Sequence, residues 1–377
     1  MIEISGSDGG GQLLRNAMAY SAISGTAFSM HSIRMNRSPP GLRPQHLTGA
    51  QLIATISKGT LDNCSVGSTR ISFVPSSSSG ANPAMIEKEK EKEKDLNEFT
   101  ADTQTAGSVT LLVQCMLPVL LLATSSQTIV VLKGGTNATL APQLDFLLLV
   151  FNPFMLHHFG IAFSLDLILR GFYPRGGGIV HLTVDPMRRE IIAITLLDPG
   201  TVMELKGRVI VGGNTPLSIG KRMKDAAVAK LMAAFPGIPV NVEIDDSASK
   251  TGSNPCIGSG SGIVLYTITS TGCTIAGSSV GHSKTSPEDT ASLAVTELVR
   301  NVKEGGCVDD CMQDQIILFL ALAKGTSRVL VGKITDHTRS AIDLAHQMTE
   351  ARFTIELQSE NSNIISCTGI GFLRVAY

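Results

Sequence analysis

Residues 2–34 read IEISGSDGGGQLLRNAMAYSAISGTAFSMHSIR, and their hydrophobic pattern changes twice within this stretch. Apolar and polar residues alternate over Ile2–Ser5, which predicts a strand, and three glycines at 9–11 then interrupt it. Over Gln12–Ser24 the apolar residues recur at helical spacing, which predicts a helix. Alternation returns over Phe28–Arg34 and predicts a second strand. The N-terminus therefore predicts a strand–helix–strand unit of an α/β fold.

Similar strand–helix units recur along the chain, with glycine turns at Gly134-Gly135 and at 176–178. We therefore expect an α/β (α+β) fold in which repeated strand–helix units form one large domain. A second pattern predicts a smaller inserted domain of order β-α-β-β-β-α, bounded by glycines. Its elements are expected at Val202–Val211, Ile219–Phe235, Val240–Ile244, Gly262–Ile268, Cys273–Ala276 and Pro287–Val302. The expected domains are residues 1–198 together with 307–377, and residues 199–306.

Residues 75–97 interrupt the order of the large domain. They contain a run of serines followed by alternating glutamate and lysine over Glu87–Lys94. This composition offers few apolar residues for a core and favours a disordered surface insertion. We assign it no function.

The overall composition limits the classes of function. Of the 377 residues, 43% are hydrophobic and 17% charged, which is enough apolar material for large buried cores. The formal net charge of −1 excludes a protein that coats a long phosphate backbone, so any nucleic-acid contact should be short, such as one chain end. The seven cysteines are scattered and odd in number, which favours a reducing compartment over a disulfide framework.

The sequence also predicts that the protein is neither secreted nor bound to a membrane. It opens with a predicted strand rather than a signal peptide. The apolar runs around Leu111–Ala123 and Leu144–Leu156 are too short to span a bilayer, and each contains a proline. Both runs are expected to be core helices.

Three segments carry residues suited to phosphate chemistry. The glycine turn of Asp8–Arg15 opens a helix that could present N–H groups to an anion, although a simple tight turn explains it equally well. Ser32–Leu47 gathers three arginines and His46 around a proline turn, which suits phosphate binding or a solvated basic loop. In Asp336–Ile342, His337 lies between a predicted strand and helix, where a neutral imidazole can attack phosphorus, but a lone histidine is more often structural.

In their order along the chain, these segments resemble the RNA 3′-terminal phosphate cyclase family, and the similarity runs over most of the sequence. Four further segments carry the resemblance: Thr103–Val109, Lys133–Ala138, Arg170–Gly178 and Asp314-Gln315. Pro40–Leu47 and His337-Thr338 are most similar to the eukaryotic branch.

The resemblance implies an ATP-dependent enzyme that converts an RNA 3′-phosphate end to a 2′,3′-cyclic phosphate. The implied reaction passes through a histidine–AMP adduct on His337 and an RNA–adenylate anhydride. It further implies Mg²⁺ or Mn²⁺ as cofactor, RNA 3′ ends and ATP as partners, and a nuclear or cytosolic location.

The resemblance also assigns roles to individual positions. Residues matching the family's nucleotide pocket are Gln114, Pro142 and Asp314, beside His337. Residues matching those needed for activity are Arg15, Arg34 and His46, as cationic groups that would clamp phosphates. Asp8 takes the place of a family glutamate that helps to hold the metal, and Cys311 replaces a tyrosine that many relatives place near the adenine.

Two other readings of the sequence compete with an active cyclase. One is the catalytically silent branch of this family, which serves in ribosome assembly and lacks the nucleophilic histidine that this chain keeps as His337. The other is an enolpyruvyl-transferase-like enzyme, which rests on analogy of architecture alone.

Overall fold

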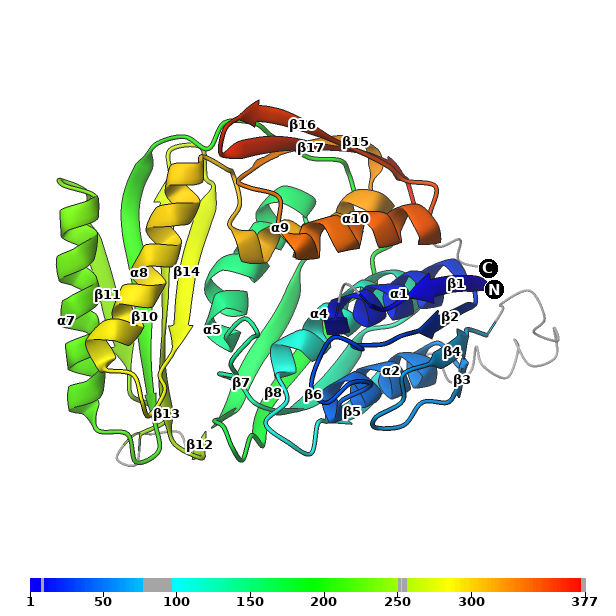
Figure 1. Ribbon diagram of the computed structural model, residues 1–377, viewed down its shortest axis with the longest axis horizontal. Coiled ribbons are helices and arrows are strands. Elements are labelled where there is room, and N and C mark those ends of the chain that lie inside the picture. The colour runs from blue at the N-terminus through cyan, green and yellow to red at the C-terminus, as the bar shows by residue number, and fades with distance from the viewer. Residues whose placement is uncertain (8–9, 77–96, 250–251, 253–255, 374–377) are drawn as a thin grey trace.

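The computed structural model describes residues 1–7, 10–76, 97–249, 252 and 256–373. The N-terminal sheet has the strand order β1-β2-β4-β3, and helices α1 (Gly10–Ser24) and α2 (Pro44–Ile56) pack against it (Figure 1). Its strands are β1 (Ile2–Ser5), β2 (Phe28–His31), β3 (Thr60–Asp62) and β4 (Ile71–Val74). The predicted strand–helix–strand unit is therefore present, with β1 and β2 parallel. Strand β2 ends three residues early because Ser32 and Arg34 have positive φ angles of 57° and 53°, which turn the backbone out of the sheet.

The central sheet supports helix α4 (Val109–Ala123), which lies beside α1 and α2. The sheet has the order β12-β7-β8-β6-β5, and α4 packs against β6 and β8. Its strands are β5 (Asn97–Asp102), β6 (Thr128–Gly134), β7 (Phe163–Gly171), β8 (Gly178–Val184) and β12 (Cys256–Ile257). Because β5, β6 and β7 run in the same direction, the loops that follow them lie at one edge of the sheet, as does the start of α4.

The apolar run around Leu144–Leu156 is helical, as predicted, but it contains two π-helical turns. It consists of α5 (Leu144–Phe146), η2 (Leu147–Phe151), α6 (Asn152–Phe154) and η3 (Met155–Phe159). Pro153 lacks the N–H that a regular helix would use, and Gly160 ends the run with a φ of 63°. No helix in the described part of the chain is long and apolar enough to cross a membrane.

The described elements between residues 202 and 304 confirm the predicted β-α-β-β-β-α order. A sheet of order β11-β10-β13-β14 is covered by two helices, seen beside it in Figure 1, and has its own hydrophobic core. The elements are β10 (Val202–Gly212), α7 (Leu217–Ala234), β11 (Val240–Asp245), β13 (Gly260–Thr269), β14 (Thr274–Val280) and α8 (Pro287–Glu304). Strand β12, within the same stretch, joins the central sheet instead. The division into separate domains at 198/199 and 306/307 stays a prediction.

The C-terminal part packs against the N-terminal part. Helix α10 (Asp336–Met348) contacts both α1 and α9 (Asp310–Leu322). The last sheet has the order β16-β17-β15-β9, from β9 (Thr195–Leu196), β15 (Lys324–Val331), β16 (Arg352–Ser359) and β17 (Ser362–Ile370). One hydrophobic core includes residues of α1, α4, α9 and α10. Segments separated by some three hundred positions therefore meet at one site, and the predicted mixed α/β class is confirmed.

Candidate active site

The site lies where the first turns of several helices meet. Gln12 is in the first turn of α1, His46 in the first turn of α2, and His337 is the second residue of α10. Asp314 lies one turn further along α9. The free N–H groups of a helix start favour anions, so helix starts that point to one place create a positive environment.

Gln12 joins two of the predicted site residues. Its Nε2 donates a hydrogen bond of 2.7 Å to the Asp314 carboxylate, so its Oε1 faces the His337 ring, 2.8 Å from Nδ1. An amide oxygen can only accept, so Nδ1 of His337 must carry the ring proton. The Nε2 of His337 is then left with its lone pair free to act as a nucleophile.

The charge state of His337 suits that role. Partial burial, followed by the nearby charges of Arg15 and Arg37, lowers the pKa of His337 below its ordinary value, and Asp336 opposes this shift. The ring is therefore neutral at pH 7, while its side chain stays exposed enough to meet a ligand. A neutral, accessible imidazole with a fixed proton is a competent nucleophile.

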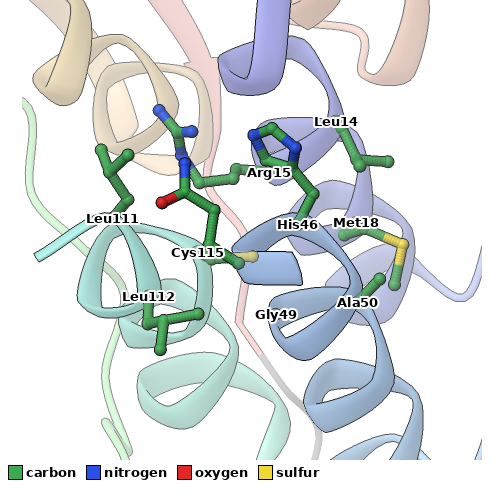
Figure 2. Close-up of a pocket in the computed structure, with 10 residues that line it drawn as sticks. Leu14, Arg15, Met18, His46, Gly49, Ala50, Leu111, Leu112 and Cys115 are labelled. Atoms are coloured by element: carbon green, nitrogen blue, oxygen red, sulfur yellow. The ribbon is translucent and has the colours of Figure 1, made fainter. Parts of the chain in front are cut away.

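Arg15 lines a cavity between α1, α2 and α4, together with His46 and Cys115 (Figure 2). Its hydrogen-bond partner is Gln114, whose Oε1 lies 3.4 Å from Nη2. Burial lowers the pKa of Arg15, and it forms no salt bridge with any residue that the structure describes. A desolvated guanidinium without a carboxylate partner is a ready site for a phosphate.

His46 is a neutral hydrogen-bond donor rather than the cation that was expected. Burial, with the nearby positive charges of Arg15, Arg34 and Arg43, lowers the pKa of His46 to about 3. Its Nδ1 accepts a hydrogen bond of 3.0 Å from the backbone N–H of Arg43, so the proton lies on Nε2. A Cβ added to Gly11 would lie 2.3 Å from that Nε2, which explains why glycine is needed there for α1 to approach His46.

The loop after β2 adds further positive charge. Arg34 donates a hydrogen bond of 3.1 Å to the carbonyl oxygen of Gly41, which joins two parts of the loop that precedes α2. Burial and the charges of Arg43 and Arg37 lower the pKa of Arg34. Mutual repulsion among these arginines would be relieved by a bound polyanion.

A second cavity lies among residues of α1, α4, α9 and the helical run that contains Phe151. Its five polar lining residues are Gln12, Asn16, Gln114, Asp314 and Gln315, and Phe151 and Phe319 are among the five apolar ones. Burial raises the pKa of Asp314 to about 7, an effect that Arg15 opposes. The cavity therefore combines hydrogen-bonding groups with an apolar surface, beside the residues that surround His337.

The structure thus brings together most of the residues that the sequence singled out. Arg15 lines the first cavity, and Gln114 and Asp314 line the second. His337 contacts Gln12, which lines the second cavity, and Arg34 adds its charge near His46. Pro142 is not among the lining residues of either cavity, and its carbonyl accepts a 2.8 Å hydrogen bond from Thr110 of α4. Asp8 lies outside the described residues.

Cys311 lines neither cavity, but it contacts Gln315, which lines the second. Its carbonyl accepts a 2.6 Å hydrogen bond from Gln315, and burial raises the pKa of its thiol. It is not among the residues that line the second cavity.

On sequence alone Gln12 has no role and Arg37 is only one of three arginines in a basic cluster, whereas in the structure both act on His337. The spacing of Gln12 three residues before Arg15 places both on one face of α1, and this could have identified it. The position of Arg37 depends on the fold of its loop and has no comparable signal.

The arrangement can support nucleophilic attack on a phosphate ester. It combines an imidazole nitrogen that carries a lone pair, a desolvated guanidinium that can balance negative charge, and a neighbouring cavity of mixed polar and apolar lining.

Comparison with known proteins identifies the family. The model of the RNA 3′-terminal phosphate cyclase family matches residues 7–355, so this chain belongs to that family. It is 35% identical over 373 residues to a probable RNA 3′-terminal phosphate cyclase of Dictyostelium discoideum, covering 97% of this chain and 81% of the relative. It is 33% identical to the RNA 3′-terminal phosphate cyclase of Drosophila melanogaster, covering 98% and 97% of the two chains.

An archaeal relative extends the agreement. The RNA 3′-terminal phosphate cyclase of Pyrobaculum aerophilum is 31% identical over 375 residues, covering 99% of both chains. The predicted family and class of enzyme are confirmed, and the silent ribosome-assembly reading is not favoured.

Proposed function

We propose that this chain uses ATP to convert an RNA 3′-terminal phosphate to a 2′,3′-cyclic phosphate, with His337 as the nucleophile. Nε2 of His337 attacks the α-phosphorus of ATP, pyrophosphate leaves, and AMP stays on the ring as a phosphoramidate. The AMP then passes to the RNA 3′-phosphate and forms an anhydride. The neighbouring 2′-hydroxyl attacks that phosphate and expels AMP, aided by its position on the same ribose.

The hydrogen bond between His337 and Gln12 is the observation that carries the proposal. At 2.8 Å it fixes the tautomer that leaves Nε2 free, and it strengthens when the ring becomes cationic in the adduct. Asp314 in turn fixes the orientation of Gln12 through the 2.7 Å contact. This geometry supports Nε2 of His337 as the attacking atom in the proposed reaction.

The other residues stabilise charge and hold the nucleotide. Arg15 and Arg34 balance the negative charge of the transferring phosphates, and the Nε2–H of His46 donates to a phosphate oxygen. Gln114 and Asp314 bind the nucleotide beside His337. Pro142 helps to position α4, which carries Gln114, through the hydrogen bond that its carbonyl accepts from Thr110.

We also propose Mg²⁺ or Mn²⁺ as cofactor, held by Asp8 and the substrate phosphates. Among the described residues no group of three or more acidic, histidine or cysteine side chains could hold a metal ion. Asp8, which lies outside the described residues, would supply a carboxylate ligand, and the ion would supply charge neutralisation at the phosphates.

The proposal extends to organisation and place in the cell. Residues 1–198 with 307–377 would form the catalytic domain, and residues 199–306 a separate inserted domain. The protein would act in the nucleus or the cytosol on RNA 3′ ends.

The direct test is turnover with defined substrates. Purified protein is incubated with ATP, a divalent metal and an RNA oligonucleotide ending in a 3′-phosphate, and the end group is analysed. A 2′,3′-cyclic phosphate that forms only with ATP supports the proposal. An unchanged 3′-phosphate, under conditions in which a known cyclase acts, refutes it.

A further inference from the structure

Three consecutive exposed residues form a projection at the turn between β7 and β8. Tyr173, Pro174 and Arg175 are exposed, whereas Phe172 and Gly176 on either side are buried. We call residues 173–175 the finger. The Tyr173 side chain is 75% exposed and is the one aromatic among the exposed large hydrophobic residues of the described chain.

The base of the finger is fixed on both sides. Phe172 is 2% exposed and lies against the backbone of the inserted unit, where a Cβ on Gly260 or Gly212 would come within 2.3 Å of its ring. The backbone N–H groups of Phe172 and Gly176 donate hydrogen bonds of 2.9 Å to the carbonyls of Ile257 and Phe172. The exposed residues are therefore carried on a rigid support, so they can bind with little loss of conformational entropy.

A series of contacts between neighbouring loops connects the finger to His46 of the candidate active site. Gly176 packs against the carbonyl of Thr105, and Gly107 in the same loop packs against Gln45. Gln45 accepts a hydrogen bond of 3.1 Å from the backbone N–H of Ser108 and is adjacent in sequence to His46. In Figure 1 the finger is the turn at the lower ends of β7 and β8, at the carboxyl edge that also carries the start of α4.

We propose that the finger binds the RNA strand a few nucleotides upstream of its 3′ end, with a base stacked on Tyr173 and a backbone phosphate on Arg175. Arg175 forms no salt bridge with any described residue, so its charge is free for a phosphate. A tyrosine ring can stack on any unpaired base without sequence preference. One stacked base agrees with a chain of net charge −1, which suits a short contact near an end.

This proposal rests on the proposed function, and a binding assay tests it separately. A 3′-phosphorylated RNA carrying fluorescent 2-aminopurine at one upstream position after another is titrated with protein. Stacking on Tyr173 should quench the fluorescence at one position. Tyr173→Ala should abolish that quenching and raise Kd about tenfold, the usual cost of losing one stacked base. Tyr173→Phe keeps the ring and should restore both within about twofold.

The matched control is Leu357→Ala, another exposed hydrophobic residue, 76% exposed on β16 at the opposite end of the molecule (Figure 1). It should bind and quench as wild type does. If Tyr173→Ala also retains wild-type quenching and Kd, the finger does not stack on RNA and the proposal is wrong.

Labelling with α-labelled ATP separates this proposal from the proposed function. Tyr173→Ala should form the protein–AMP adduct at the wild-type rate, because the finger does not touch the nucleotide cavities. Equal losses of labelling and RNA binding would indicate a general structural defect and overturn the proposal. A wild-type protein that never labels would refute the proposed function, while the quenching result would still decide whether the finger binds RNA.

Discussion

Replacing Gln12 with alanine tests the geometry of the nucleophile. The change removes the acceptor 2.8 Å from Nδ1 of His337 and the donor 2.7 Å from Asp314. His337 can then place its proton on either nitrogen and rotate away from the attacking position. We expect Gln12→Ala to fold, because Gln12 lies at the start of α1 beside a cavity.

The magnitude follows from the charge that develops on the ring. Attack on the α-phosphorus makes the imidazole cationic, so the Nδ1–H bond to Gln12 becomes a charge-assisted one. Such bonds contribute about 1.5–3 kcal/mol. Since each 1.36 kcal/mol changes a rate about tenfold, Gln12→Ala should slow adduct formation by about 10- to 100-fold.

The assay measures the single-turnover rate of AMP transfer from α-labelled ATP to the protein. Gln51→Ala is the matched control, because Gln51 is an exposed glutamine on α2. It should label at the wild-type rate. A Gln12→Ala protein that is folded and labels as fast as the control would refute the role of the hydrogen bond.

Two further predictions concern the same site, and a third concerns the insertion. Arg15→Ala should slow labelling by about 10²- to 10³-fold, because it removes a positive group that stabilises the negative charge developing on the phosphate. An unchanged rate would show that Arg15 contributes only to packing. Because the pKa of His337 is lowered, its neutral form persists at pH 6.5 and the labelling rate should fall only at more acidic pH; a fall centred above pH 6.5 would contradict this. Deletion of Glu87–Lys94 should leave turnover of 3′-phosphorylated RNA unchanged, and a large loss would show that the insertion takes part.

Local patterns predicted the elements of the fold well. The alternation in Ile2–Ser5 and the helical spacing after Gln12 both correspond to observed elements, as do the six elements expected between 199 and 306. Departures arose where the backbone conformation of single residues decided the outcome. Positive φ angles at Ser32 and Arg34 end β2 early. The pairing of β12 with β7 depends on a contact distant in sequence that no local pattern encodes.

The site was predicted as a set of residues, but their chemical states depend on packing. The contact between Gln12 and His337 joins positions 325 apart in the chain. From the sequence, His46 is expected to be a cation, as an exposed histidine can be near neutral pH. In the structure, burial beside three arginines lowers the pKa of His46 to about 3, so the ring is neutral. Its change from cation to neutral donor could not be predicted from residue type and spacing.

The central claim is that one imidazole nitrogen becomes covalently attached to AMP. The most direct measurement is to incubate the protein with ATP, digest it at alkaline pH and identify the AMP-bearing peptide by mass spectrometry. AMP should be on His337, with none on the His337→Ala variant and normal labelling of His282→Ala, which removes an exposed histidine of the inserted unit. An adduct on any other residue, or equal labelling of His337→Ala, would contradict the account.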